Sequence, residues 1–237
     1  MRKRNASRQK AASHRKSMPL LGILTGIVGF FFLFTCSVVL VLNFRPLYYH
    51  DVQSLHPPEE TGLSQETICQ NYDVLIDYNL FWKGQDTLRF PNFPMSEQGR
   101  IHFEEVKRIF VVLQYGMIAA LMLFTGGIIW NVRRKSYGFL RATAVAALAI
   151  PVVLGALVAI NWERFFIGFH KLMFLNDYWL FDPAKDPVIL ILPDEFFFHC
   201  AAAVIVCFVA GGIFCEIVYR VVRRKEYTYT KTMEDGK

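Results

Sequence analysis

A histidine among carboxylates and aromatic rings is the first feature of this sequence that could do chemistry. The stretch FHKLMFLNDYWLFDPAKDP, residues 169–187, contains His170, Asp177, Asp182 and Asp186 between long apolar runs. Ionisable side chains beside membrane-crossing segments are costly and usually serve a function. An imidazole gains and loses a proton near neutral pH, so this stretch predicts a site of acid–base chemistry.

A second histidine, His102, is the expected partner of His170. It precedes the apolar run that starts at Ile109 by seven residues, so a continuous helix would place it about 10 Å above that point. His170 follows another apolar run by a similar length, and both rings are therefore expected at the same height on one face of a membrane. Glu105 is expected on the same side of the helix as His102, where its carboxylate can hold an imidazole N–H and fix the tautomer.

The same residues could instead bind a metal ion. His102 and His170 with one of Glu105, Asp177 or Asp182 would supply two imidazoles and a carboxylate. The sequence contains no HExxH motif or comparable pair of ligands, so we expect no bound metal and no other cofactor. It also contains no GxSxG motif and no Walker loop, which argues against a serine hydrolase and a nucleotide-driven pump.

Four apolar stretches are long enough to cross a bilayer and must position these side chains. The sequence is 54% hydrophobic and 15% aromatic, which is typical of a small multi-span membrane protein. About 20 apolar residues are needed to span the hydrocarbon core. The stretches run from Leu20 to Leu42, from Ile109 to Trp130, from Ala142 to Ile160 and from Phe196 to Tyr219.

The distribution of charge predicts how these spans are oriented. Lys and Arg are concentrated before the first span, between the second and third, and after the fourth, which places these segments in the cytoplasm. Residues 44–108 include ten acidic and six basic residues, and residues 162–195 include six acidic and three basic, so both are expected outside. The net charge of +6 thus reflects topology and attraction to anionic lipid, and we expect no nucleic-acid partner.

These patterns predict an all-α membrane protein with four transmembrane helices, both termini in the cytoplasm and a small mixed extracellular cap. The predicted segments are a basic cytoplasmic tail (1–18), a first span (19–43), an extracellular cap segment (44–106), a second span (107–132), a cytoplasmic link (133–141), a third span (142–161), an extracellular loop with site residues (162–195), a fourth span (196–220) and a cytoplasmic tail (221–237).

The first outer segment is long enough to form the cap. Ser64 is the expected N-cap of a helix, with Leu63 and Ile68 as its hydrophobic staple. The stretch TLRFPNFPM, residues 87–95, predicts an extended piece or a short strand pair. Ser96 is the expected N-cap of a helix that runs unbroken into the second span.

The second outer segment is expected to begin as a continuation of the third span. The helix should run through NWERFFIGFHKLMF, residues 161–174, and the Asp-Pro steps that follow should break it. VILILP, residues 188–193, predicts a strand or a segment lying on the membrane. Among the other histidines, we expect His14, His50 and His56 to be exposed without a role, and His199 to pack at the membrane interface.

Several of these stretches resemble a known family. SEQGRIHFEEVKRIF and GFHKLMFLNDYWLFDPAKDPVILILPDEFF, with NYDVLIDY upstream, resemble the lipoprotein intramolecular transacylases of low-GC Gram-positive bacteria. The resemblance covers most of the chain from about Leu63 onward, and it rests on the patterns HFxxVK and FH…WxxDPxxD. Glu105 stands where the family's HFxxVK motif has Asp, and the extra methylene changes the reach of this carboxylate.

The resemblance implies a lipid-modifying reaction without an added cosubstrate. The substrate would be a diacylated lipoprotein whose N-terminal Cys carries diacylglycerol on sulfur. The enzyme would move the sn-2 acyl chain to the α-amine of the same Cys, which leaves an N-acyl, S-monoacylglyceryl (lyso) lipoprotein. The implied partners are this substrate and membrane lipid, and no obligate protein partner is implied.

His102 and His170 are the expected catalytic residues of that reaction. One would act as base and the other would donate to the oxyanion or the leaving oxygen, and the sequence leaves the assignment open. Asp177 and Asp182 would anchor polar groups or the substrate ammonium, and Trp179 would lie at the lipid boundary. Further candidates for binding the substrate, all from the cap, are Tyr72, Asp73 and Tyr78.

Two functions of other classes are alternatives. The chain could be a non-enzymatic four-span adaptor that binds a partner through its cap, or a metal-dependent lipid hydrolase at the same site. Lipopeptide analysis separates all three, because only the transacylase forms an N-acyl, S-monoacylglyceryl Cys.

Overall fold

The described part of the chain contains helices and irregular segments. A computed structural model describes residues 20–55 and 61–235, so the predicted tail at 1–18, with His14, and the residue His56 lie outside the described residues. Its elements are α2 (Leu20–Asn43), α3 (Arg45–Ser54), α5 (Gln65–Asn79), α6 (Glu97–Arg133), α7 (Gly138–Ile160), α8 (Trp162–Met173) and α9 (Asp194–Asp235), with the 3-10 helices η1 (Phe81–Lys83) and η2 (Pro187–Ile191).

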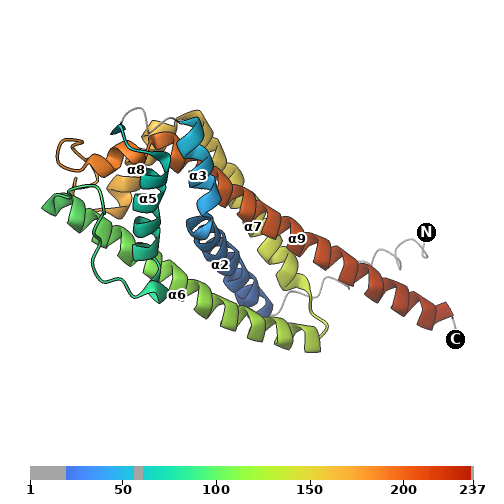
Figure 1. Ribbon diagram of the computed structural model, residues 1–237. Helices are drawn as coiled ribbons and strands as arrows, with labels where there is room; N and C mark the ends of the chain where they lie inside the picture. The colour runs from blue at the N-terminus through green and yellow to red at the C-terminus, as the bar shows by residue number, and fades with distance from the viewer. Residues whose placement is uncertain (1–19, 56–60, 236–237) are drawn as a thin grey trace.

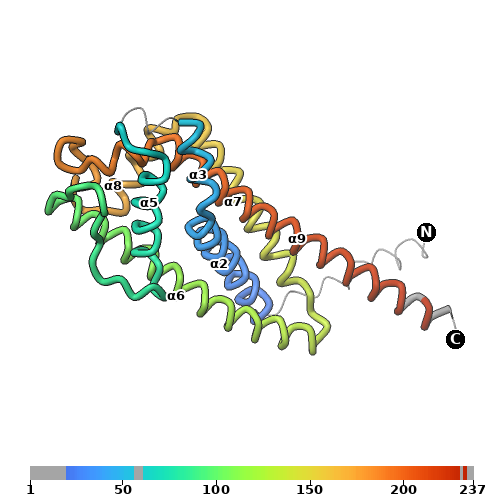
Figure 2. Tube along the Cα trace, viewed as in Figure 1, coloured from blue at the N-terminus to red at the C-terminus, as the bar shows by residue number. Residues whose placement is uncertain are grey.

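Four of these helices, α2, α6, α7 and α9, are long and apolar enough to cross a membrane, which confirms the predicted all-α class with four spans. In Figure 1 they extend from one end of the molecule, while α3, α5 and α8 gather at the other end. The trace in Figure 2 shows that the segments between α2 and α6 and between α7 and α9 both lie at this second end. The short link between α6 and α7 lies at the first, so both segments expected to be outside share one end of the molecule.

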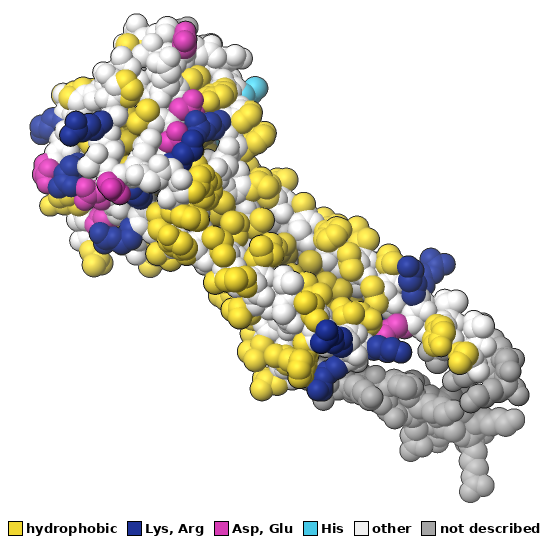
Figure 3. Space-filling view, turned by 60° about the horizontal axis from the view of Figure 1, so that its bottom comes forward, with side chains coloured by type: hydrophobic (Ala, Val, Ile, Leu, Met, Phe, Trp, Pro, Cys, Tyr) yellow, Lys and Arg dark blue, Asp and Glu magenta, His cyan; other side chains and the backbone are white. Residues whose placement is uncertain are grey.

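The surface between the two ends is apolar. On the face shown in Figure 3, hydrophobic side chains cover the middle of the molecule, and charged side chains lie at its ends. Residues such as Val112, Met122 and Val152 are 64%, 64% and 70% exposed. Such a belt is expected where lipid, rather than water or protein, surrounds the helices.

The helix α2 packs against all three other spans, and small side chains allow this close approach. A side chain at Gly29 would collide with Phe124 of α6 and Thr143 of α7, since a Cβ there would lie 2.6 Å from atoms of both. Two buried hydrogen bonds add to the packing: Thr143 Oγ1 donates to the Gly26 carbonyl (3.1 Å), and Asn131 Nδ2 donates to Thr25 Oγ1 (3.0 Å). Membrane helices commonly associate through small residues and such polar contacts.

The cap has its own hydrophobic core beneath α3 and α5. Tyr48 and Tyr72 stack with their ring centroids 3.7 Å apart, and the Tyr48 hydroxyl donates to the Ile191 carbonyl of η2 (2.7 Å). Ile68 is fully buried in this core. The predicted N-cap of α5 is confirmed, because the Ser64 hydroxyl accepts from the Thr67 N–H (3.2 Å).

The strand pair considered for residues 87–95 is wrong, because within the described ranges the structure contains no strand. Pro91 and Pro94 have no N–H to give to a ladder. The segment is held instead by a side-chain amide: Asn71 Nδ2 donates to Asn92 Oδ1 (2.9 Å), and the Asn92 N–H donates to Asn71 Oδ1 (3.3 Å). Residues 188–193 likewise form the end of η2 and a turn rather than a strand.

The helix α6 runs unbroken from the cap into its span, as predicted. Ser96 is its N-cap, and the Ser96 hydroxyl accepts from the Gly99 N–H (3.0 Å). The polar first turns of α6 therefore carry His102 on the same rigid element as the apolar stretch that starts at Ile109.

The predicted continuity of the third span through residues 161–174 is wrong. Asn161 is extended, with φ −160° and ψ 96°, and separates α7 from α8. Its side chain accepts from the Arg164 N–H (2.8 Å), so Asn161 starts a new helix as its N-cap. The break changes the direction of the chain, so that α8, which carries His170, approaches the N-terminal turns of α6 in the cap.

Candidate active site

The structure brings the two predicted histidines together from different helices. The ring centroids of His102 on α6 and His170 on α8 lie 6.2 Å apart. Phe174, directly after α8, contacts both rings, at 4.7 Å from His102 and 5.7 Å from His170. The proximity of the two rings was predicted from the helix rise. At this separation, both imidazoles can contact one small ligand group.

His170 is held in one orientation by its own helix. Its Nδ1 lies 2.8 Å from the carbonyl oxygen of Phe166, one turn earlier on α8. A carbonyl oxygen can only accept, so Nδ1 carries the proton and Nε2 of the neutral ring carries the lone pair. The rings of Phe166 and Trp179 pack at 4.1 and 4.8 Å from the imidazole. This arrangement presents His170 Nε2 as a base.

His102 is the more deeply buried of the pair. Its side chain is 6% exposed, and its ring also contacts Phe181 at 5.4 Å between centroids. Burial, and then the proximity of His170, lower the pKa of His102 to about 4. This residue lies in the polar turns of α6 before the apolar stretch, so it stays neutral at physiological pH and can offer an N–H without carrying charge.

The pKa of His170 is also lowered from its ordinary value. Burial is the main cause, and it is opposed by the hydrogen bond to the Phe166 carbonyl and by the charge of Asp194 at the start of α9. The ring is therefore neutral near pH 7, and the carbonyl and the carboxylate both favour the cation that it becomes when it takes a proton.

Glu105 does not orient His102 as the spacing suggested. Its Oε1 accepts from the side-chain amide of Asn176, in the loop after α8, at 3.0 Å. In the described part of the chain, Glu105 Oε2 and His102 Nδ1 are both buried without a hydrogen-bond partner. The Glu105 carboxylate thus contacts the segment after α8. The spacing of three residues between His102 and Glu105 could not predict this long-range contact.

The two loop carboxylates predicted to anchor the substrate have different surroundings. Asp182 caps its own turn, where it accepts from the Ala184 N–H (3.0 Å) and pairs with Lys185 (3.4 Å). Asp177 is exposed and borders an opening of about 310 Å³ lined by Lys171, Phe174, Leu175, Asn176 and Asp177. This opening lies beside the histidine pair, since Phe174 contacts both rings.

Asp186 is a residue whose importance the sequence did not reveal. Its side chain is buried, and it accepts from the Ser96 N–H and the Ser96 hydroxyl, both at 2.7 Å. A side chain at Gly99 would collide with this carboxylate. Asp186 therefore fastens the second outer segment to the N-terminus of α6, where the helix dipole favours a negative charge. The sequence predicted Ser96 as an N-cap, but it did not predict the contact of Ser96 with Asp186.

Trp179 lies over the site rather than at a lipid boundary. Its side chain is 8% exposed and packs on His170. Its Nε1 is buried without a hydrogen-bond partner among the described residues. An indole N–H can only donate, so the site contains one unused donor beside the base.

The three cap residues predicted to bind the substrate make contacts away from the histidine pair. Tyr72 packs in the cap core, Asp73 pairs with Arg45 (2.8 Å) and accepts from the Tyr49 hydroxyl (2.8 Å), and Tyr78 lies under Lys107 with 4.2 Å from Nζ to the ring centroid. These contacts indicate that Tyr72, Asp73 and Tyr78 stabilise the cap. Within the described chain, none of the three residues has a recorded contact with His102 or His170.

A metal site receives no support from the geometry. Within residues 20–55 and 61–235, no group of three or more His, Cys, Asp or Glu side chains converges in a way that could hold a metal ion. Glu105, the carboxylate three residues after His102, is turned toward Asn176. The two imidazoles therefore fit proton transfer better than metal ligation.

A second histidine–carboxylate contact lies in the cap. His199 Nδ1 lies 2.8 Å from Asp51 Oδ2, and His50 Nδ1 lies 3.6 Å from Asp51 Oδ1. The Asp51 side chain is buried, so this contact fastens α3 to the start of α9. The expectation that His199 only packs is thus corrected, whereas His50 is exposed as predicted.

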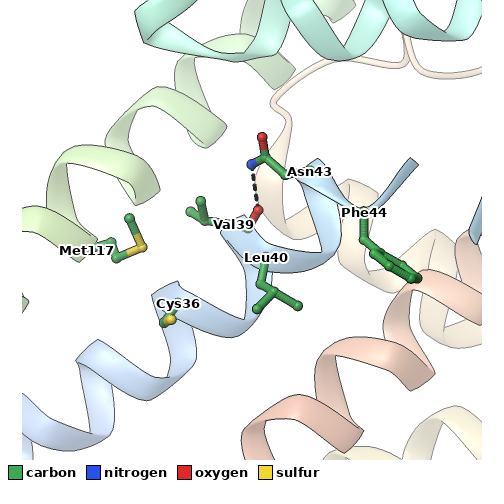
Figure 4. Close-up of a pocket in the computed structure, with 6 residues that line it drawn as sticks. All are labelled: Cys36, Val39, Leu40, Asn43, Phe44 and Met117. Carbon is green, nitrogen blue, oxygen red and sulfur yellow. Dashed lines mark hydrogen bonds between the residues drawn. The ribbon is translucent and has the colours of Figure 1, made fainter. Parts of the chain in front are cut away.

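An apolar hollow lies between α2 and α6, away from the histidines. Figure 4 shows its lining by Cys36, Val39, Leu40, Asn43, Phe44 and Met117, and its volume is about 340 Å³. The only polar amide in it, Asn43 Nδ2, donates to the Val39 carbonyl (2.7 Å). Met117 lies about 22 Å beyond His102 along α6. The hollow suits hydrocarbon and carries no acid or base.

Comparisons with known proteins agree on one family. The family model described as lipoprotein intramolecular transacylase Lit matches residues 23–197. A search of curated proteins gives no match. The chain is similar to an in meso structure of the membrane integral lipoprotein intramolecular transacylase Lit from Bacillus cereus, with 37% identity, a TM-score of 0.86, and coverage of 88% of this chain and 97% of that one.

Two further structures of the Bacillus cereus protein are similar as well. Each carries a substitution of a histidine, in one to arginine and in the other to alanine. Their identities to this chain are 35% and 36%, and their TM-scores are 0.81 and 0.80. Both alignments cover 94% of this chain and 99% of the other.

Proposed function

The chain belongs to the lipoprotein intramolecular transacylase family, and we propose that His170 and His102 perform its O-to-N acyl transfer at the outer face of the membrane. The protein is an integral membrane enzyme. The observation that carries the assignment of residues is the 6.2 Å separation of two neutral imidazoles, one of which has its tautomer fixed by a backbone carbonyl.

His170 is the general base of the proposed reaction. The α-amine of the substrate has an ordinary pKa of about 8 and attacks in its unprotonated form. Its nitrogen becomes cationic when it bonds to the ester carbon, so a base must then take a proton from it. Nε2 of His170 carries the available lone pair, because Nδ1 donates to Phe166. The same carbonyl stabilises the imidazolium that forms when the proton arrives.

His102 and Trp179 are the proposed donors to the oxyanion. His102 is neutral over the physiological range because its pKa is lowered to about 4, and a neutral imidazole can donate without taking part in proton uptake. The buried indole N–H of Trp179 has no partner in the described chain and flanks His170. Two fixed and buried donors stabilise a developing negative charge strongly.

The proposed reaction balances without a cosubstrate. The α-nitrogen of the N-terminal Cys attacks the sn-2 ester carbonyl, a C–N bond forms, and the carbonyl oxygen becomes the oxyanion. His170 takes a proton from the nitrogen. When the adduct collapses, the bond from the carbonyl carbon to the glycerol oxygen breaks, and His170 returns its proton to that oxygen. Nucleophile and ester belong to one molecule, so the protein mainly folds the substrate into attack geometry.

The substrate is a diacylated lipoprotein whose acyl chains lie among membrane lipid while its headgroup reaches the cap. Support for the outer side comes from the charge of the segments: residues 44–108 and 162–195 are acid-rich, whereas the Lys and Arg residues concentrate on the opposite segments. The site lies at the end where both acid-rich segments gather. The ester bonds of a bilayer lie near its interface, at the height expected for the histidine pair.

Mass spectrometry of lipoprotein N-terminal peptides tests the proposal. A host that lacks this activity should produce N-acyl, S-monoacylglyceryl Cys when it expresses the chain, and His170→Ala and His102→Ala should each abolish that product while the protein is still made. Unchanged lipopeptides with the wild-type chain would favour the non-enzymatic adaptor. Loss of a fatty acid without its transfer to nitrogen would instead indicate a hydrolase.

A further inference from the structure

The carboxylate of Glu105 has an unusual combination of partners. It lies about 4.5 Å beyond His102 along α6. One oxygen accepts from Asn176, which fixes the orientation of the side chain, and the other is buried without a partner in the described chain. A buried acceptor that is left unfilled is costly, so the free oxygen marks a place for a donor that the protein itself does not supply.

Two neighbouring basic residues of α6 have partners other than Glu105. Arg100 pairs with Glu97 and Glu104, and Lys107 donates to the Gln85 carbonyl. In the described residues no Lys, Arg or His forms an ion pair with Glu105, whereas Asp73, Asp77, Asp182 and Glu216 each have a basic partner. A cation that carries N–H groups would pair with this free oxygen of Glu105.

We propose that Glu105, held by Asn176, binds the α-ammonium group of the lipoprotein's N-terminal Cys. This proposal deepens the function proposed above and rests on it. Asn176 also lines the opening beside Phe174, and Phe174 contacts both catalytic rings. An amine that reaches this opening is thus close to Asn176, the partner of Glu105, and to Phe174, which contacts His170.

The carboxylate acts on the α-nitrogen at two stages of the reaction. On arrival the nitrogen is an ammonium, and Glu105 recognises its charge. This ammonium releases its first proton to solvent before the attack, which leaves His170 free to take the second. After attack on the ester, the nitrogen of the tetrahedral adduct is again cationic until His170 takes its proton. An acceptor fixed at this position stabilises both charged forms and keeps the neutral amine aimed at the ester between them.

The two loop carboxylates predicted from the sequence fit this role less well. Asp182 already caps its own turn and pairs with Lys185. Asp177 is exposed, and the surrounding water screens its charge. Glu105 differs from both because its position is fixed, its free oxygen is buried, and it shares a helix with His102.

The experiment compares two unreactive lipopeptides as inhibitors of the purified full chain. Both carry ether-linked alkyl chains that cannot be transferred, and one has a free α-amine while the other is N-acetylated. The wild-type enzyme should bind the free amine roughly 10- to 100-fold more tightly, the range expected for one charge-assisted hydrogen bond. In Glu105→Gln, which can still accept from Asn176, the two inhibitors should bind equally.

The matched control is Glu104→Gln, one residue away, where the exposed carboxylate pairs with Arg100. This variant should keep the wild-type preference for the free amine. Preserved discrimination in a folded Glu105→Gln enzyme, judged by its wild-type affinity for the N-acetylated inhibitor, would overturn the proposal. Because inhibitor binding does not depend on turnover, that result would leave the proposed transacylation by His170 and His102 intact, and loss of turnover in the histidine variants would leave the ammonium site intact.

Discussion

The Nδ1 atom of His170 lies 2.8 Å from the carbonyl oxygen of Phe166, and this contact fixes which nitrogen of the ring can act as a base. The two histidines should therefore respond differently to glutamine. His170→Gln removes the basic lone pair and should lower kcat by about 10³-fold. His102→Gln retains an N–H donor of similar reach and should lose about tenfold less. Single-turnover assays with a synthetic diacylated lipopeptide measure both, and equal losses would contradict the separate roles.

The pH dependence of the reaction follows from the lowered pKa of His170. A base whose pKa is below its ordinary value of about 6.5 stays neutral, and therefore active, as the pH falls from 8 toward 6.5. At saturating lipopeptide, kcat should fall over that range by no more than tenfold per pH unit, because only the substrate α-amine, with an ordinary pKa of about 8, gains a proton there. Protonation of His170 should add a second, steeper decline only at lower pH. A decline steeper than tenfold per pH unit that already begins above pH 6.5 would speak against His170 as a base with a lowered pKa.

Trp179→Phe keeps an aromatic ring over His170 and removes only the indole N–H. We expect a loss of about 10²-fold in kcat with little change in KM, because the donor is used in the tetrahedral adduct more than in the ground state. Trp162→Phe is the matched control, since its Nε1 is also buried without a partner in the described chain, but its ring packs on Phe165, Phe166 and Phe198. The control should keep nearly full activity.

Asp186→Ala should destabilise the cap, because it breaks the contact between the segment after α8 and the start of α6. It leaves the partly buried Ser96 N–H without its acceptor and removes a second hydrogen bond from the Ser96 hydroxyl. The expected cost is about 2–4 kcal/mol, observed as a lower midpoint of thermal unfolding in detergent. Asp182→Ala, which removes only an exposed turn cap and its pair with Lys185, should cost about 1 kcal/mol or less. Equal shifts would contradict the role given to Asp186.

Removal of metal ions should leave the activity unchanged. The proposed chemistry uses only imidazole, indole and carboxylate groups, so incubation with a chelator followed by the lipopeptide assay should give the untreated rate. Activity that is lost on chelation and restored by zinc would contradict this expectation and support the metal-dependent alternative.

Local patterns predicted most of the fold. The spans followed from the length of apolar runs, and the N-caps at Ser64 and Ser96 followed from residue type and position. The break at Asn161 was missed, although Asn is a favoured N-cap, because the apolar pattern continued through it. The extended residues 87–95 formed no ladder because two prolines lack donors and Asn71 supplies the hydrogen bonds instead.

The candidate site was predicted only in part. Helix rise and the shared face were enough to bring His102 and His170 together. The contacts of Glu105 with Asn176 and of Asp186 with Ser96 join separate segments of the chain, and no local spacing encodes them. Trp179 was expected at a lipid boundary because of its residue type, but the loop folds it onto His170.

The unbroken course of α6 ties the reaction to the dimensions of the host membrane. His102 belongs to the same rod as the span, so its depth is set by hydrophobic matching between that rod and the surrounding lipid. In a thicker bilayer, the helix tilts less or the surrounding lipid becomes locally thinner. In a thinner bilayer, the helix tilts more. Each response shifts the imidazole of His102 relative to the plane of the ester groups. The rate of turnover should therefore depend on the acyl-chain length of the surrounding lipid.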